Sequence, residues 1–136
     1  YTVKHMLELG YRFAELKEVG YTAEQMRKAD FNIEELMDGG YTAHQLIDGG
    51  YTAEQMRREV GYGIVELKYI GYTAEQMRKA GYSIADLKDV GYTPEQMWKA
   101  GCSIVELKDS GCTAYELKSG YTAKQMRKAG YSIAEL

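Results

Sequence analysis

Histidine and cysteine, the residue types that most often ligate metals or act in nucleophilic catalysis, are scarce in this chain of 136 residues. The two histidines are His5 and His44. Neither has a cysteine, serine or carboxylate at a spacing that indicates a metal site or a catalytic triad. A catalytic site needs several convergent groups. We therefore expect no enzyme activity, no catalytic or metal-binding residue and no cofactor, with the histidines solvated or capping a helix.

The two cysteines, Cys102 and Cys112, stand at equivalent places in the sequence, ten residues apart. One interpretation is that they are small apolar residues that fill positions held elsewhere by tyrosine. The other is a disulfide, which would require their Cα atoms to lie about 4.4–6.8 Å apart. Two cysteines alone do not make a zinc site.

These residues belong to a ten-residue repeat that runs through the whole chain. The stretch Gly-Tyr-Thr-Ala-Glu-Gln-Met-Arg-Lys-Ala-Gly spans Gly71 to Gly81, and close copies recur along the chain. One residue is inserted in the repeat from Tyr51, and one is deleted from the repeat at Cys112. Numbered from the aromatic residue, the repeats begin at Tyr1, Tyr11, Tyr21, Phe31, Tyr41, Tyr51, Tyr62, Tyr72, Tyr82, Tyr92, Cys102, Cys112, Tyr121 and Tyr131. Residues 1–136 thus form a single tandem array, which we expect to be a piece of a longer one.

Each repeat specifies both ends of a short helix. Position 2 is Thr, Ser or Asn in twelve of fourteen repeats and position 5 is Gln or Glu in twelve, which is the pattern of a capping box. Positions 1 and 6 hold the aromatic residue and a Met or Leu, a pair typical of a hydrophobic staple. Glycine at position 10 is typical of a left-handed helix end. The exceptions to the capping box are Arg12 and Gly63 at position 2, and His5 and Asp86 at position 5.

A helix of about seven residues is too short to be stable alone, so neighbouring helices must stack their apolar positions 3, 6 and 9 together. Repeats with Ala at position 3 alternate with repeats that hold Ile or Phe there, which suits interdigitating helices. The predicted fold is all-α: a solenoid or superhelix of about fourteen two-turn helices, paired as a twenty-residue module. Over its whole length the chain resembles the broad class of short-helix tandem-repeat solenoids.

Two glycine pairs, Gly39-Gly40 and Gly49-Gly50, close consecutive repeats. We expect them to end two helices early and to loosen that part of the array.

Composition and charge narrow the possible partners. The net charge of −3 and the pI of about 5.5 provide no field that attracts nucleic acid. A repeated Arg-Lys pair could follow phosphates, but Asp38, Asp48, Asp89 and Asp109 dilute it, so nucleic-acid backbone binding is only a remote alternative. No apolar run approaches the roughly 18 residues that a membrane span needs.

The repeat is broken at six positions that should face water. Position 7 is usually Arg or Lys, yet four repeats hold an apolar residue there, and a tyrosine replaces the usual residue once at position 8 and once at position 4. One interpretation is that local twist buries these residues, or that a non-repeat segment outside this chain covers them. The other is a surface for a protein partner, anchored by Trp98, in which Met37 and Ile47 of adjacent repeats join into one patch. The six residues are Leu7, Met37, Ile47, Trp98, Tyr69 and Tyr115.

Together these observations predict a non-enzymatic repeat scaffold or protein–protein interaction surface. The alternative is a self-assembling fibre or spacer, because the open ends of a solenoid can stack head to tail.

Overall fold

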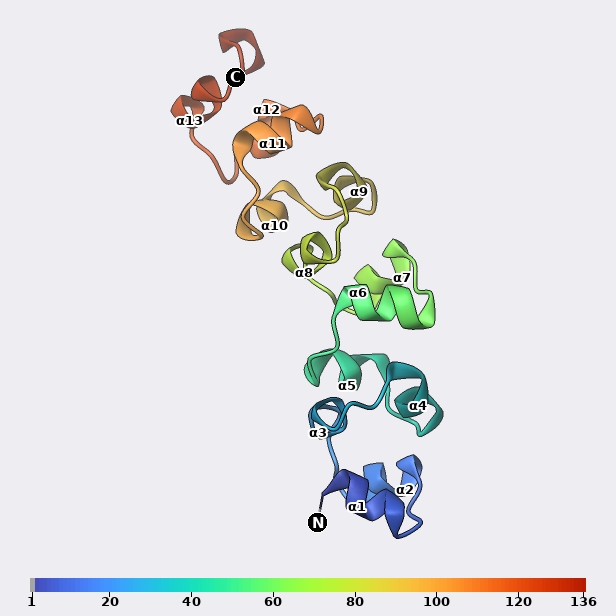
Figure 1. Cartoon of the computed structure of the whole chain (residues 1–136). Helices are drawn as coiled ribbons and strands as arrows, with labels where there is room; N and C mark the ends of the chain where they lie inside the picture. The colour runs from blue at the N-terminus through green and yellow to red at the C-terminus, as the bar shows by residue number, and fades with distance from the viewer. Residues whose placement is uncertain (1) are drawn as a thin grey trace. The chain divides into compact units, whose positions relative to one another are not determined.

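The computed structural model describes residues 2–136, and this part of the chain contains helices and turns but no strand. Thirteen short α-helices follow one another along it (Figure 1), which confirms the predicted all-α repeat fold. Most have six residues, one fewer than expected, and occupy positions 3 to 8 of the repeat. Their bounds are α1 Val3–Glu8, α2 Phe13–Glu18, α3 Ala23–Lys28, α4 Ile33–Asp38, α5 Ala43–Asp48, α6 Ala53–Gln55, α7 Ile64–Tyr69, α8 Ala74–Lys79, α9 Ile84–Asp89, α10 Pro94–Lys99, α11 Ile104–Asp109, α12 Ala114–Leu117 and α13 Ala123–Lys128, and a 3₁₀ turn follows at Ile133–Glu135.

The helix starts follow the capping pattern of the sequence. At α8 the backbone N–H of Gln76 donates to the Thr73 hydroxyl at 3.2 Å, and the N–H of Thr73 donates to the Gln76 side-chain oxygen at 2.8 Å. These two bonds satisfy two backbone donors that the first turn would otherwise leave unpaired. Arg12 and Gly63 supply no side-chain cap, as expected. Asp86 differs from expectation, because it completes a capping box with its serine partner.

The helix ends have the geometry of a Schellman motif, in which the chain turns through a left-handed residue. After α8 the N–H of Gly81 donates to the Arg78 carbonyl at 2.9 Å, and the N–H of Tyr82 donates to the Met77 carbonyl at 3.2 Å. Gly81 has a φ of +96°, which a residue with a side chain rarely adopts. Asp30 takes this left-handed conformation at the end of α3, with a φ of +66°.

The inserted and the deleted residue are each absorbed within one repeat. The insertion turns the second half of the helix that begins with α6 into a π-helical turn, Met56–Val60, which ends at left-handed Gly61. A π-turn accommodates one extra residue inside a helix. The deletion shortens α12 to four residues, and its closing glycine, Gly120, has no positive φ.

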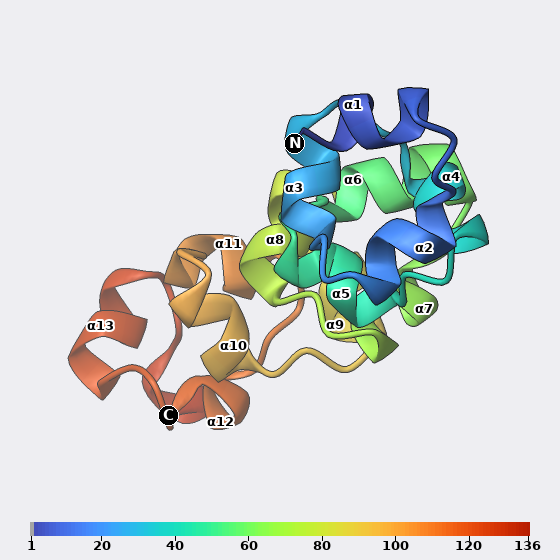
Figure 2. The ribbon, with the colours of Figure 1, turned by 90° about the horizontal axis from the view of Figure 1, so that it is seen from below.

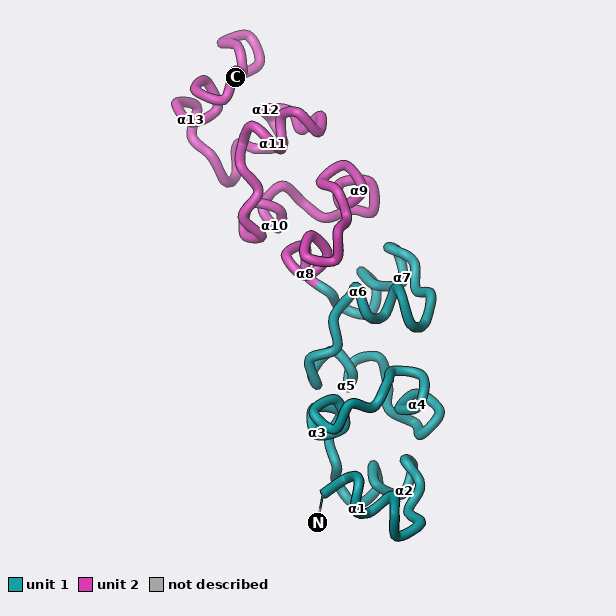
Figure 3. The backbone as a smooth tube through the Cα atoms, viewed as in Figure 1, with its two compact units in different colours: residues 1–72 teal, residues 73–136 magenta. Residues whose placement is uncertain are grey.

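The chain divides into two compact units, one ending at Tyr72 and the other running from Thr73 to Leu136 (Figure 3). We call them unit 1 and unit 2. Within unit 1, α3 contacts α5, and α2 contacts α4, which in turn contacts the π-helical turn. Within unit 2, α10 lies against both α8 and α12. Within each unit, helices therefore stack on the helix two repeats away and so form two columns. Short loops join consecutive helices (Figure 2). This confirms the twenty-residue module.

Position 6 forms the core of both units. Its side chains are completely buried in most repeats, and they are joined by the smaller residues at position 3 and by several of the aromatic residues at position 1. Burial of an apolar side chain of this size contributes about 1.5–3 kcal/mol, so this stripe is the main source of stability. The fully buried members of position 6 are Leu16, Met26, Leu36, Leu46, Met56, Leu67, Met77, Leu87, Met97, Leu107 and Leu117.

The expectation for the two glycine pairs is wrong. Helices α4 and α5 have the same six residues as their neighbours, so neither ends early. Gly39 and Gly49 are buried where two stacked helices approach closely. A side-chain carbon at Gly49 would lie 2.7 Å from the Cβ of Ala23, and one at Gly39 would lie 2.5 Å from the Cβ of Phe13. The glycines permit tight stacking and do not loosen the array.

Candidate functional site

In several repeats of each unit, a tyrosine hydroxyl at position 1 links one turn to the turn before it. In unit 1 the Tyr41 hydroxyl donates to the Tyr21 carbonyl at 2.7 Å, and the Tyr72 hydroxyl donates to the Tyr51 carbonyl at 2.8 Å. Tyr51 makes the same bond to the Phe31 carbonyl at 2.6 Å. Burial raises the pKa of Tyr51 and of Tyr72 to about 12, because ionisation of a buried phenol is unfavourable.

Unit 2 contains the same links. The Tyr121 hydroxyl donates to the Cys102 carbonyl at 3.1 Å, and the Tyr131 hydroxyl donates to the Cys112 carbonyl. The sequence contained a signal for these bonds, since position 1 is tyrosine in eleven of fourteen repeats and phenylalanine in only one. A staple needs only a ring, so the preference for a hydroxyl indicates a hydrogen-bond partner.

The cations at position 7 also link consecutive turns, which corrects the expectation that they face water. In unit 1 the Lys17 ammonium donates to the Gly40 carbonyl at 2.6 Å, and Arg27 donates to the Gly49 carbonyl at 2.7 Å. In unit 2 Arg78 donates to the Ala100 carbonyl at 3.1 Å. Each cation thus reaches the end of the helix stacked on its own, where carbonyl groups have no partner inside the helix.

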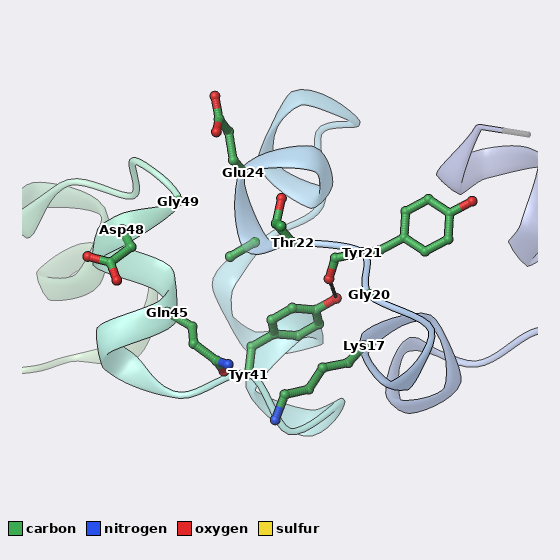
Figure 4. A pocket seen from close by; sticks show the side chains of 10 residues that line it. Lys17, Gly20, Tyr21, Thr22, Glu24, Tyr41, Gln45, Asp48 and Gly49 are labelled. Atoms are coloured by element: carbon green, nitrogen blue, oxygen red, sulfur yellow. Dashed lines mark hydrogen bonds between the residues drawn. The ribbon is translucent and has the colours of Figure 1, made fainter.

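A groove lies between α3 and α5 in unit 1, with a volume of about 440 Å³ (Figure 4). The tyrosine link of Tyr41 crosses it, and the Lys17 side chain runs beside the Tyr41 ring. Its walls come from the N-terminal half of one helix and from positions 5, 8 and 9 of the next helix in the column. Polar and charged side chains that line the groove include those of Lys17, Thr22, Glu24, Tyr41, Gln45 and Asp48.

The same groove recurs in other turns. Between α1 and α3 in unit 1 a cavity of about 480 Å³ is lined by equivalent positions, including Lys4, Gln25 and Lys28. Between α9 and α11 in unit 2 a cavity of about 440 Å³ is lined by Arg78 and Glu106, among others. The backbone frame is constant, whereas the charge at positions 4, 5, 7 and 8 changes from groove to groove. The grooves therefore share one backbone frame and differ in the charges that line it.

The six positions at which the repeat is broken fall into two groups. Leu7, Met37 and Ile47 are half-buried at position 7, the position that elsewhere carries the linking cation. Met37 lies on α4 and Ile47 on α5, which are consecutive helices in different columns. The patch expected from these two residues stays a prediction. Trp98 is 45% exposed, stands edge-on to the Tyr121 ring at 6.1 Å, and lies against Gly120. Part of its surface is therefore used inside the array.

The two tyrosines are the most exposed of the six. Tyr69 on α7 is 88% exposed, and Val65, one turn earlier on the same helix, is 65% exposed. Tyr115 on α12 is 74% exposed, with the Lys118 ammonium 3.9 Å from the centre of its ring. Val65 was not among the predicted residues, although its place at position 4, four residues before Tyr69, puts the two on one helix face.

Cys102 and Cys112 are buried free thiols in the structure, and burial raises the pKa of each. They fill the tyrosine position, as one interpretation held, and the disulfide stays a prediction. The Thr2 hydroxyl accepts a hydrogen bond from the backbone N–H of His5 at 3.1 Å, so His5 stands at the expected position of a helix cap. His44 lies exposed on α5.

Among residues 2–136, no group of three or more histidines, cysteines and carboxylates is placed to hold a metal ion. None of the helices described is long and apolar enough to cross a membrane.

Comparison with known proteins gives one match. The family described as a decapeptide repeat region matches residues 1–59 and 50–120. No curated protein and no solved structure matches the chain.

Proposed function

This chain belongs to the decapeptide repeat region family, and we propose that it acts as a non-enzymatic scaffold that binds other proteins. The observation that supports the proposal is the outward face of α7. In α3, α8 and α10 positions 4 and 8 hold an exposed Glu–Lys ion pair, such as Glu75 with Lys79 at 3.4 Å. In α7 the same two positions hold Val65 and Tyr69.

An exposed valine–tyrosine pair adds nothing to the stability of α7 that a Glu–Lys pair would not. Apolar side chains that stay in water gain no burial energy within the chain, whereas they contribute strongly when a partner covers them. Tyrosine is also among the residues that most often dominate the energy of protein–protein interfaces. Tyr115 and Trp98 offer similar surfaces in unit 2, with the difference that Trp98 also packs on Tyr121.

Site-specific photo-crosslinking tests this proposal. A photoreactive amino acid is placed at Tyr69 of the full chain and, as a matched control, at Lys79, which holds the same repeat position on α8. Both variants are irradiated in an extract of cells that express the chain. We expect discrete crosslinked proteins from position 69 and none of these from position 79. Identical patterns from the two positions would contradict the assignment of α7.

A self-assembling spacer is the second candidate, and exposed apolar residues in the first and last turns support it. Leu9 and Val19 in unit 1 are 59% and 64% exposed, and Ile133 in unit 2 is 74% exposed. These faces resemble those that stacked helices cover elsewhere, so they would accept a further repeat or the end of a second copy. Light scattering across a concentration series tests self-assembly. A constant monomer mass at high concentration would exclude it.

A further inference from the structure

We infer that the two grooves on either side of α3 together bind one extended peptide segment with a basic and an acidic side chain about three residues apart. The inference rests on the proposed scaffold function and specifies the chemistry of a partner. It concerns unit 1 only, and it uses the groove between α1 and α3 and the groove between α3 and α5.

The two grooves carry opposite charge. Lys4 and Lys28 line the groove between α1 and α3, and the other residues that line it are uncharged. Glu24 and Asp48 line the groove between α3 and α5. The Lys17 ammonium also lies there and donates to the Gly40 carbonyl at 2.6 Å, but the two carboxylates outnumber this one cation. A carboxylate of a partner would therefore favour the first groove, and an ammonium or guanidinium group would favour the second.

The spacing of the grooves determines the spacing of the partner's charges. Stacked helices lie about 8–10 Å apart, so the centres of two successive grooves are separated by about that distance. An extended peptide advances about 3.3 Å per residue, so about three residues span it. Tyr21 lines both grooves, which makes the surface between them continuous. The two side chains of one short peptide can therefore enter both grooves.

Each groove also presents a donor for the peptide backbone. The side-chain oxygens of Gln25 and Gln45 accept the N–H groups of Thr22 and Thr42, each at 2.8 Å. Within residues 2–136 the amide nitrogens of these glutamines donate no hydrogen bond. An amide that is fixed through its oxygen and exposes its NH₂ group is oriented to donate to a carbonyl of a bound peptide.

The ion pair between Glu24 and Lys28 on α3, the helix that separates the two grooves, opposes peptide binding only weakly. Lys28 and Glu24 are 3.1 Å apart, and both side chains are more than half exposed. An exposed pair of this kind is weak, so either residue can turn to a stronger partner in its own groove. Because Lys28 lines one groove and Glu24 the other, a peptide with both charges would engage the two residues together.

Fluorescence anisotropy with synthetic peptides tests the inference. The probes are labelled ten-residue Gly-Ser peptides with Arg and Glu three residues apart, made in both orders, and the comparison peptides have two Arg, two Glu, or Arg and Glu six residues apart. With the full chain at low salt, we expect one order of the three-residue spacing to bind about three- to fivefold more tightly than every comparison peptide. Affinities within twofold of one another for all peptides would overturn the inference.

Charge reversal at a single position supplies the matched control. Asp48→Lys should abolish the preference for the mixed peptide and favour the peptide with two Glu. Asp109→Lys changes the same repeat position in unit 2 and should leave the preference intact. Equal effects of the two variants would overturn the assignment to unit 1. If Tyr69 still gives specific crosslinks when no peptide preference is found, the groove assignment fails and the scaffold function stands; loss of both results contradicts the scaffold itself.

Discussion

The same repeat positions line two grooves, one between α3 and α5 in unit 1 and the other between α9 and α11 in unit 2. The bonds that join the turns at these grooves differ. In unit 1 the Tyr41 hydroxyl bridges the turns, and position 5 is the uncharged Gln45. In unit 2 position 1 is Cys102, which has no hydroxyl, and Arg78 forms an ion pair with Glu106 at 3.3 Å. A directional neutral hydrogen bond in one groove is thus replaced by an ion pair in the other.

The exchange occurs twice in unit 2. The repeat from Cys112 also lacks the hydroxyl, and its Glu116 lies 3.7 Å from the Lys88 ammonium. Where tyrosine stands at position 1 in the repeats from Tyr41, Tyr51 and Tyr72, position 5 is glutamine. In the two repeats that begin with cysteine, an ion pair between side chains therefore takes the place of the tyrosine hydroxyl bond, beside the cation–carbonyl bonds that both units contain. The ion pairs should respond to salt, because partly exposed ion pairs are screened.

Among the substitutions considered, Gly49→Ala should lower the free energy of unfolding most, by about 1–3 kcal/mol. The added carbon would lie 2.8 Å from the backbone of Ala23. Ser110→Ala changes the equivalent position in unit 2 and should alter the free energy of unfolding by less than about 0.5 kcal/mol. Urea denaturation followed by circular dichroism measures both. At an ordinary helical φ such as the −76° of Gly49, Gly→Ala normally stabilises, so a gain at Gly49 would show that the close contact is absent.

Tyr72→Phe should lower the free energy of unfolding by about 1–2 kcal/mol, because it removes a buried hydroxyl and leaves the Tyr51 carbonyl without that donor. Tyr69→Phe removes a hydroxyl from a side chain that is 88% exposed, and it should change stability by less than about 0.5 kcal/mol. The same denaturation experiment compares them. Equal losses would mean that the hydroxyl link does not hold unit 1 together.

High pH should weaken unit 1 through the same tyrosines. The pKa of Tyr51 and of Tyr72 is about 12 in the folded chain, compared with about 10 when unfolded. The fold therefore favours the neutral phenol, so this contribution to stability is complete below pH 10 and is lost as the pH rises toward 12. Urea midpoints between pH 9 and 11.5 should fall more steeply for the unmodified chain than for Tyr72→Phe. Parallel curves would contradict the assignment.

Removal of an ion pair in unit 2 should have the smallest effect on the free energy of unfolding. Glu106→Gln should destabilise by at most about 1 kcal/mol at low salt, and the loss should vanish near 1 M salt. The reciprocal change, Gln45→Glu, places a carboxylate at the position from which it could pair with Lys17 and should stabilise by a few tenths of a kcal/mol. Denaturation at two salt concentrations measures both. A Glu106→Gln effect that does not depend on salt would show that the pair is not electrostatic.

Local features of the fold could be predicted from the sequence because their partners lie within one repeat. The cap of Thr73 and Gln76 spans three residues, and the helix end at Gly81 involves carbonyls three and five residues before the donors. Position 6 was recognisable as core since it is Met or Leu in every repeat. Even Asp86, which we took for an exception, follows the rule, because its carboxylate is long enough to accept the N–H of Ser83 at 3.2 Å.

Features that join different turns could not be predicted in the same way. The bond from Lys17 to Gly40 spans 23 residues, and it follows only from the stacking of helices two repeats apart. Without that pairing, position 7 looked exposed and Gly49 looked like a loosening residue. The grooves were missed for the same reason, because Glu24 and Asp48 come from different helices. Of the two apolar residues on the outward face of α7, Tyr69 was predicted from the sequence and Val65 was not.

The π-helical turn at Met56–Val60 has a consequence for how such chains change over generations. The helix around it still begins at the Thr52 cap and ends at left-handed Gly61, so one extra residue leaves the next repeat intact. A repeat array that confines an inserted residue to a single helix keeps its downstream repeats in phase, so its length can change by one residue without a loss of folding.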